Sequence, residues 1–173
     1  MEEIDETPYW HLVPSSNTWA LMFYNNVRVA SGLLHSISYM IECDPNLASA
    51  TSNYALTHAE DEKEKTFERV RQEQFPRKPS RLKTLYVFPS EALAQRAKME
   101  WFPNESRNIH RAWIATGAKT HLGDAALLNC KPESWVANAH SYWAAEMSTS
   151  PFLEMLVHGS LYFPDWQGFP KAP

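Results

Sequence analysis

The stretch Pro151-Phe152-Leu153-Glu154-Met155-Leu156-Val157-His158-Gly159 is an apolar run with a single carboxylate in its middle. The run predicts a β-strand over residues 152–157. A glutamate inside such a strand is costly to desolvate unless it lies at a cleft or has a partner. Glu154 is therefore the first candidate for a functional residue.

The length and composition of the chain predict one domain. The 173 residues fit a single domain over residues 1–173, with a core at about residues 9–163 and an irregular tail at residues 164–173. The two cysteines, Cys43 and Cys130, are expected to be buried small residues in a reducing cytoplasm. The acidic N-terminus lacks a secretory pattern, and no apolar run is long enough to span a membrane. We therefore expect a cytoplasmic protein without a membrane partner.

The charge of the chain limits its partners. A formal net charge of −4 argues against affinity that depends on a general basic surface. A local basic groove stays open as an alternative, because six cations are close in sequence: Arg69, Arg71, Arg77, Lys78, Arg81 and Lys83. The aromatic content of 13% fits either large core residues or surfaces that stack a nucleobase or a nicotinamide ring.

The order of the predicted elements indicates the fold class. Strands are expected at residues 9–13, 28–34, 81–88, 109–115, 125–128, 152–157 and 161–163. Helices are expected at residues 15–24, within residues 46–74, from Ser90 to before Pro103, and at residues 135–143. Because these elements do not alternate regularly, they predict an α+β fold.

Motifs for several common functions are missing from the sequence. The chain has no Walker loop, Rossmann glycine fingerprint or nucleophile elbow. Its seven histidines do not fall at zinc-binding spacing, which argues against a metal site. His158-Gly159-Ser160 follows a strand, and a turn with a hydrogen-bonded histidine explains it better than a catalytic triplet.

Three polar residues interrupt apolar strands: His11 in the first, Tyr86 in a central one and Glu154 in a late one. A histidine in such a strand is more often structural, and a strand tyrosine is usually a core residue. A glutamate among Phe, Leu, Met and Val fits a structural and a functional interpretation equally well.

In this order the three residues resemble the His-Tyr-Glu branch of the ADP-ribosyltransferase superfamily, which diphtheria toxin and the poly(ADP-ribose) polymerases typify. The chain is most similar to small bacterial and phage members, which include DNA- and RNA-modifying toxins. The similarity covers about residues 9–163. It is carried by Tyr9-Trp10-His11, by Tyr86-Val87-Phe88-Pro89-Ser90-Glu91-Ala92-Leu93-Ala94, by Glu154-Met155-Leu156-Val157-His158-Gly159, by Tyr142-Trp143-x-x-Glu146 and by Phe75-Pro76-x-x-Pro79-Ser80-Arg81.

The resemblance implies a split mixed or antiparallel sheet with short flanking helices, and a reaction that consumes NAD. Glu154 would stabilise the positive charge that develops on the ribose when the nicotinamide bond breaks. His11 would hydrogen-bond a ribose hydroxyl, and Tyr86 would face the nicotinamide ring. Arg81 and Ser80 would contact NAD, with Arg81 at the pyrophosphate. A solvated charge beside a strand is the alternative for Arg81.

The chain departs from some relatives in ways that bear on the acceptor. Arginine-modifying toxins carry Glu-x-Glu and a first-strand arginine, where this chain has Phe152 and His11. This difference argues against arginine as the acceptor. A second ring-stacking tyrosine of the polymerases would fall at Ala97, so that another aromatic residue such as Trp101 would have to take its place.

Three hypotheses follow. The first is an NAD-dependent ADP-ribosyltransferase acting on a macromolecule, with DNA or RNA slightly favoured over protein, in a toxin or phage–host conflict that could involve an antitoxin or inhibitor. The second is an inactive binding module with the same fold. The third is an ordinary α+β interaction protein, in which Glu154 would pair with an internal arginine and no cleft would join it to His11.

Overall fold

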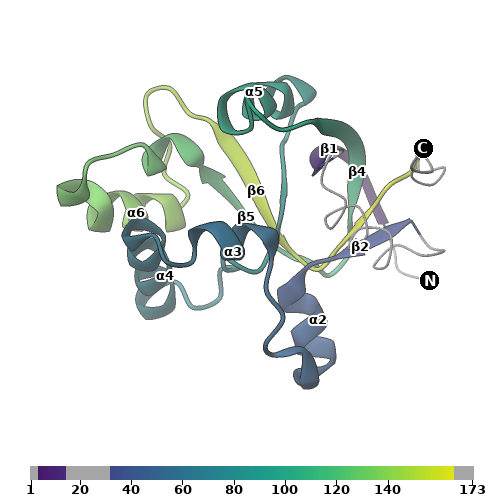
Figure 1. Ribbon diagram of the computed structural model, residues 1–173, viewed down its shortest axis with the longest axis horizontal. Coiled ribbons are helices and arrows are strands. Elements are labelled where there is room, and N and C mark those ends of the chain that lie inside the picture. Colours follow the sequence, from purple (N-terminus) through teal and green to yellow (C-terminus); the bar gives the residue numbers. More distant parts are fainter. Residues whose placement is uncertain (1–3, 15–31, 166–173) are drawn as a thin grey trace.

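The computed structural model describes residues 4–14 and 32–165. Within these residues, strands form two antiparallel sheets with short helices around them (Figure 1). The predicted α+β class is therefore confirmed. The predicted helix at residues 15–24, the first part of the predicted strand at residues 28–34 and most of the tail lie outside the described residues.

The secondary-structure elements follow the chain in a mixed order. The strands are β1 (Ile4–Pro14), β2 (Leu33–His35), β3 (Leu85–Val87), β4 (Arg107–Ala115), β5 (Lys119–Asp124), β6 (Leu153–His158) and β7 (Ser160–Tyr162). The helices are α2 (Ile37–Cys43), α3 (Asn53–His58), α4 (Glu62–Gln74), α5 (Glu91–Trp101) and α6 (Trp135–Trp143), with 3₁₀ helices η1 (Pro45–Leu47), η2 (Ala125–Leu128) and η3 (Pro132–Ser134).

The two sheets meet at a single backbone bridge between strands in the described part of the chain. One sheet has the order β1-β4-β7-β2 and the other has the order β3-β6-β5. Trp10 of β1 exchanges two backbone hydrogen bonds with Phe88, which directly follows β3, at N–O distances of 3.0 and 2.8 Å. The chain also passes from β6 to β7 through Gly159. Strands β1, β3 and β6 are therefore neighbours.

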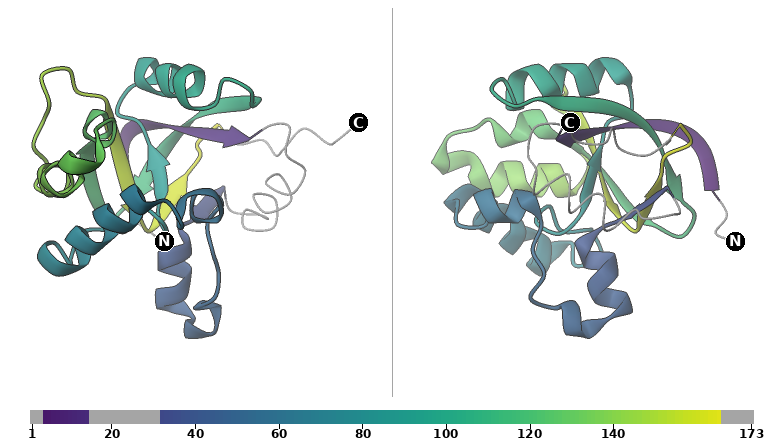
Figure 2. Two further views of the ribbon diagram at one scale, coloured as in Figure 1. Left: turned by 60° about the vertical axis from the view of Figure 1, so that its left-hand side comes forward. Right: turned by 45° about the vertical axis from the view of Figure 1, so that its right-hand side comes forward.

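Helices cover the sheets from several sides (Figure 2). Helix α5 packs on β1 and β4, whereas α4 and α6 pack on each other and α6 also packs on β5. The core is divided between the two faces of β3 and β6. Leu12, Phe88 and Leu156 belong to a cluster with α4 and α6 residues, and Val13, Val87 and Val157 belong to a second cluster with β7 residues.

Several elements form where the sequence predicts them. Ser90 caps α5, because its side-chain oxygen accepts from the Leu93 amide at 3.2 Å, and the helix ends at Trp101 before Pro103. Helix α6 matches its predicted bounds. Strands β1, β4, β6 and β7 overlap their predicted ranges.

Other expectations were wrong in detail. Residues 125–128 form η2 instead of a strand, because the Asp124 side chain accepts from the Ala126 amide and starts a helical turn. The strand predicted at residues 81–88 begins only at Leu85, since a turn precedes it in which Thr84 donates to the Ser80 carbonyl at 2.8 Å. The helical region within residues 46–74 is broken into η1, α3 and α4. Helix α2 and strand β5 were not predicted.

The cysteines also differ from expectation, since Cys43 is exposed and Cys130 is only partly buried. Cys43 is the last residue of the short helix α2, which leaves its side chain in solvent. In residues 4–14 and 32–165, no helix combines the length and the apolar character that a membrane crossing requires.

Candidate functional site

Glu154 lies in β6 with 1% of its surface exposed. It is opposite Gly123 of β5, and a Cβ on Gly123 would lie 2.4 Å from the Tyr142 ring. The missing side chain therefore lets Tyr142 pack against the sheet. From this position the Tyr142 hydroxyl donates to Glu154 Oε1 at 2.8 Å. Helix α6 thus covers the Glu154 carboxylate.

Arg81 is the charged partner of Glu154. Arg81 is 4% exposed, and its Nη1 donates to Glu154 Oε1 and to the Tyr142 hydroxyl. Nε of the same side chain donates to Glu64 Oε2 at 3.2 Å. One buried cation therefore holds two buried carboxylates, one from β6 and one from α4.

Two tyrosines complete the network in matching ways. Arg81 Nη2 donates to the Tyr54 hydroxyl at 2.9 Å, and Tyr54 donates to Glu64 Oε1 at 2.5 Å. Tyr142 likewise accepts from Arg81 and donates to Glu154. Each hydroxyl accepts a hydrogen bond from the guanidinium and donates one to a carboxylate. With both tyrosines neutral and both acids ionised, this Arg81 network, made of Tyr54, Glu64, Arg81, Tyr142 and Glu154, carries one excess negative charge.

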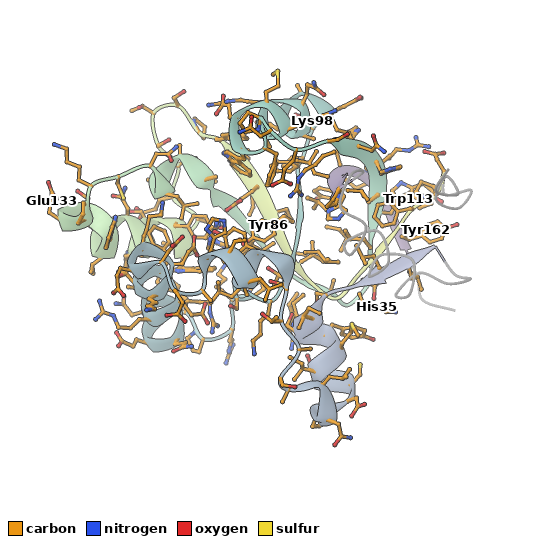
Figure 3. All side chains as sticks on the ribbon, in the orientation of Figure 1. His35, Tyr86, Lys98, Trp113, Glu133 and Tyr162 are labelled. Atoms are coloured by element: carbon orange, nitrogen blue, oxygen red, sulfur yellow. The ribbon has the colours of Figure 1, made fainter. Side chains whose placement is uncertain are left out.

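Tyr86 lies beside the Arg81 network, near the middle of the molecule (Figure 3). Its hydroxyl donates to the Arg81 carbonyl at 2.6 Å, and the Arg81 guanidinium carbon is 5.5 Å from its ring centroid. The Tyr54 ring centroid is 5.2 Å from that of Tyr86. The ring that was expected to face nicotinamide is therefore in contact with a residue of α3.

The electrostatics of the network favour a charged arginine among neutral tyrosines. Burial opposes the charge on Arg81, but the Glu154 carboxylate offsets this and the pKa of Arg81 rises well above its usual value. Burial also raises the pKa of Tyr86 and of Tyr142. For Tyr54 burial has the same effect, and the neighbouring Glu64 carboxylate adds to the rise in pKa. All three hydroxyls are therefore hydrogen-bond donors at neutral pH.

His11 is buried in β1 but does not join this network. Its Nδ1 donates to the Tyr86 carbonyl at 2.6 Å, and its ring meets Phe163 edge-on at 5.9 Å. Since Trp10 is opposite Phe88, His11 points to the face of Val87, whereas Tyr86 and Glu154 point to the other face. The structure brings together Arg81, Tyr86 and Glu154, and leaves His11 one strand away on the opposite face.

Ser80 and some residues of the basic cluster form hydrogen bonds and ion pairs within the protein. Ser80 donates to Glu68 Oε2 at 3.0 Å, and Arg71 forms a bidentate pair with the same carboxylate. Arg81 is buried in the network described above. Of the six clustered cations, three have exposed positions: Arg69, Arg77 and Lys83. The local basic groove that the sequence left open therefore has fewer free cations than the cluster suggests.

Sequence reasoning missed the roles of Tyr54, Glu64 and Tyr142. A signal for Glu64 is present, because it shares the buried face of α4 with Phe67 and Val70, and an acid on an apolar helix face needs a partner. Tyr142 stands in a segment that carried the family resemblance, but nothing in its local sequence points to Glu154. The pairing of these residues depends on long-range packing.

His121 of β5 sits next to the network as a buried neutral base. Its Nε2 donates to the Tyr142 carbonyl at 2.9 Å, and Nδ1 has no hydrogen-bond partner in the described part of the chain. Burial, together with repulsion from Lys78, lowers the pKa of His121 from 6.5 to about 4. Between about pH 4 and pH 6.5, His121 therefore stays neutral in the folded state but binds a proton in the unfolded chain.

We expect His121 to make the protein less stable in acid. As pH falls from about 6.5 to about 4, the unfolded state binds a proton that the folded state excludes, which costs up to about 3 kcal/mol of unfolding free energy. Urea unfolding at pH 7 and pH 4.5 measures this loss. His121→Leu should show a smaller loss than the native chain, and His140→Gln, an exposed histidine, should match the native chain. Equal losses in the native chain and in His121→Leu would contradict the expectation.

The chain matches a protein family over most of its length. Residues 15–164 match the family described as "Protein of unknown function (DUF2441)". No curated protein matches the chain.

Proposed function

The chain belongs to the DUF2441 family, and we propose that it is an NAD-dependent ADP-ribosyltransferase whose carboxylate is Glu154. In the proposed reaction the bond between ribose C1′ and the nicotinamide nitrogen breaks, and nicotinamide leaves with the bonding electrons. Glu154 stabilises the positive charge on the ribose. A nucleophile of the acceptor then bonds to C1′ and releases its proton. The fold proposed with this function is the ADP-ribosyltransferase-like split sheet.

The observation that carries the proposal is the buried Arg81–Glu154 pair beside Tyr86. A buried ion pair gives little stability compared with apolar residues of the same volume, so its presence in a core calls for another reason. Buried acids with strongly perturbed neighbours are typical of active sites. The three residues of the resemblance also lie on the neighbouring strands β1, β3 and β6.

The proposal requires Glu154 to become accessible. In the conformation described here, Arg81 and Tyr142 occupy the carboxylate and Tyr54 covers the Tyr86 ring. We infer that this is a closed state and that NAD displaces Arg81 toward Glu64, with the guanidinium then free to meet the pyrophosphate. His11, which faces away, would take part only through its hydrogen bond to the Tyr86 backbone.

A non-catalytic interaction domain is the second candidate, and one specific observation favours it. Glu154 pairs with an internal arginine, which is what a structural role predicts for this residue. In that case the Arg81 network would only fix the packing of α3, α4 and α6 on the sheet. NAD would then neither bind nor be consumed.

Labelled NAD separates the two candidates. The purified chain is incubated with whole-cell lysate and NAD labelled in its adenylate phosphate, and the product is treated with nuclease or with protease. Label that is released by nuclease identifies a DNA or RNA acceptor, which we test first, and label released by protease identifies a protein acceptor. No incorporation, together with no thermal stabilisation by saturating NAD, would establish the non-catalytic candidate.

A further inference from the structure

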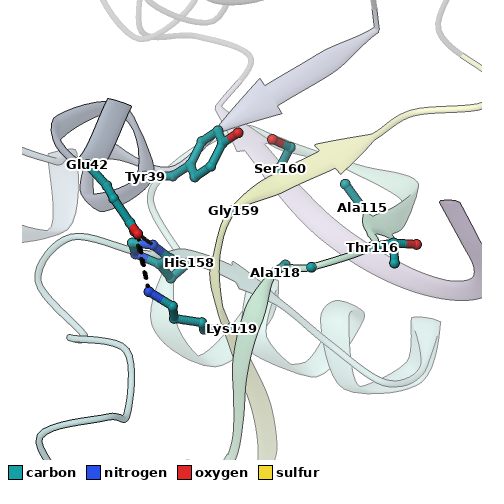
Figure 4. A pocket seen from close by; sticks show the side chains of 10 residues that line it. Tyr39, Glu42, Ala115, Thr116, Ala118, Lys119, His158, Gly159 and Ser160 are labelled. Atoms are coloured by element: carbon teal, nitrogen blue, oxygen red, sulfur yellow. Dashed lines mark hydrogen bonds and ion pairs between the residues drawn. The ribbon is translucent and has the colours of Figure 1, made fainter. Parts of the chain in front are cut away.

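A pocket with a cavity of about 260 Å³ opens at the end of β6 that is remote from Glu154 (Figure 4). Its walls come from three parts of the chain: Tyr39 and Glu42 of α2, residues 115–119 around the turn between β4 and β5, and residues 158–160. None of these residues belongs to the Arg81 network. Glu154 and His158 are four positions apart in an extended strand, or about 13 Å. The pocket is therefore a separate site.

A carboxylate closes one side of this pocket. Glu42 accepts from His158 Nε2 at 2.5 Å and from Lys119 Nζ at 3.4 Å (Figure 4). The hydrogen bond from His158 is the main cause that lowers the pKa of Glu42, and the one from Lys119 adds to it. The Glu42 side chain is therefore an anion at neutral pH. Two nitrogen donors thus already hold an anionic group at the pocket.

The Glu42 carboxylate can leave the pocket, whereas its donor His158 is held in place by burial. The Glu42 side chain is 56% exposed and His158 is 14% exposed. An exposed ion pair such as Lys119–Glu42 favours its paired over its separated form by no more than about fivefold. A rotation of the Glu42 side chain into solvent would leave His158 and Lys119 directed at the cavity. A second anion could then occupy the same place.

Hydroxyl groups line the opposite side of the pocket. The hydroxyls of Tyr39 and Ser160 point toward one another in Figure 4. Ser160 is 2% exposed, and its Oγ is 2.6 Å from Nδ1 of His35, the residue opposite it in β2. This contact fixes the Ser160 side chain. Hydroxyls opposite the two nitrogen donors suit the several oxygen atoms of a phosphate or carboxylate group.

We propose that this pocket binds the phosphate or carboxylate group of a small metabolite, and that Glu42 is the internal anion which the ligand replaces. The cavity is smaller than the usual range for drug-sized ligands, so the bound molecule is small. Lys119 offsets its charge, His158 donates a hydrogen bond from Nε2, and Ser160 and Tyr39 hydrogen-bond its oxygen atoms. The proposal is independent of NAD chemistry, because the two sites share no residue.

Titration calorimetry with inorganic phosphate and with acetate at constant ionic strength tests the proposal. Glu42→Gln removes the competing charge while keeping the side-chain shape, and should bind phosphate about threefold more tightly than the native chain. Lys119→Met should bind more weakly. Glu133→Gln and Lys131→Met change exposed charges elsewhere and should match the native chain. Tighter binding of phosphate than of acetate would identify a phosphorylated ligand, and the reverse a carboxylate.

Two results would overturn the proposal. One is the absence of phosphate and acetate binding at millimolar concentrations in both the native chain and Glu42→Gln. The other is equal binding by the native chain and Glu42→Gln, because Glu42 would then not compete with the ligand. Glu154→Gln should leave the binding unchanged, so that a failure of the proposed transferase activity does not affect the result.

Discussion

Glu154→Gln is expected to lower ADP-ribose transfer by at least about 100-fold while the chain stays folded. Glutamine keeps an oxygen that can accept from Tyr142 and Arg81, and Arg81 keeps its second carboxylate, Glu64. The folded state therefore loses one charge but no side-chain volume. The reaction loses the anion that stabilises the positive ribose.

Transfer of label from NAD measures this prediction, and circular dichroism with urea unfolding checks the fold. Glu133→Gln, at an exposed position in η3, is the matched control and should retain full transfer. Normal transfer by folded Glu154→Gln would show that another residue performs the role assigned to Glu154. Loss of transfer in folded Glu154→Gln would also exclude a purely structural role for Glu154.

Arg81→Met is expected to destabilise the protein by about 3–5 kcal/mol, because it leaves Glu64 and Glu154 buried without a cation. Methionine fills much of the space of the arginine chain, so the lost charge dominates the effect. The triple variant Arg81→Met, Glu64→Gln, Glu154→Gln should regain much of this loss, since the uncompensated charges are removed as well.

Urea unfolding at pH 7 measures these differences in free energy. Arg111→Met provides a control for the loss of an arginine in an ion pair, because the Arg111–Asp165 pair is solvent-exposed. This control should cost no more than about 1 kcal/mol. A loss below about 1 kcal/mol in Arg81→Met would mean that the two carboxylates gain protons or water without penalty, and that the pair is not essential to the packing.

The sequence predicted those elements whose signals are local. Helix α5 follows from Ser90 as a cap and a proline after its end, and β6 follows from its apolar run. Strand β5 was missed because Lys119-Thr120-His121-Leu122-Gly123-Asp124 is polar and contains a glycine. That glycine makes room for Tyr142 of α6, a requirement that appears only in the packed structure.

The candidate site was predictable to a similar extent. An acid in an apolar strand indicated Glu154, and its burial confirms that the residue needs a partner. The identity of that partner could not be derived, since Arg81 looked like one member of an exposed basic cluster and is 73 positions away. Nor could the sequence show that the side chains of His11 and Glu154 point to opposite faces of the strands, because this depends on the register of the bridge between Trp10 and Phe88.

That bridge has a mechanical consequence. In the described residues the two sheets are joined by one bridge of two backbone hydrogen bonds, by the hydrogen bond from His11 to the Tyr86 carbonyl, and by the chain passages at Gly159 and at residues 116–118. An apolar cluster with Val87 and Leu161 also spans both sheets. A rotation of one sheet against the other would break these few hydrogen bonds and disturb the shared cluster, whereas separating β6 from β5 would break a ladder of six residue pairs. Backbone pairing among the described strands is therefore weaker between the two sheets than within either of them.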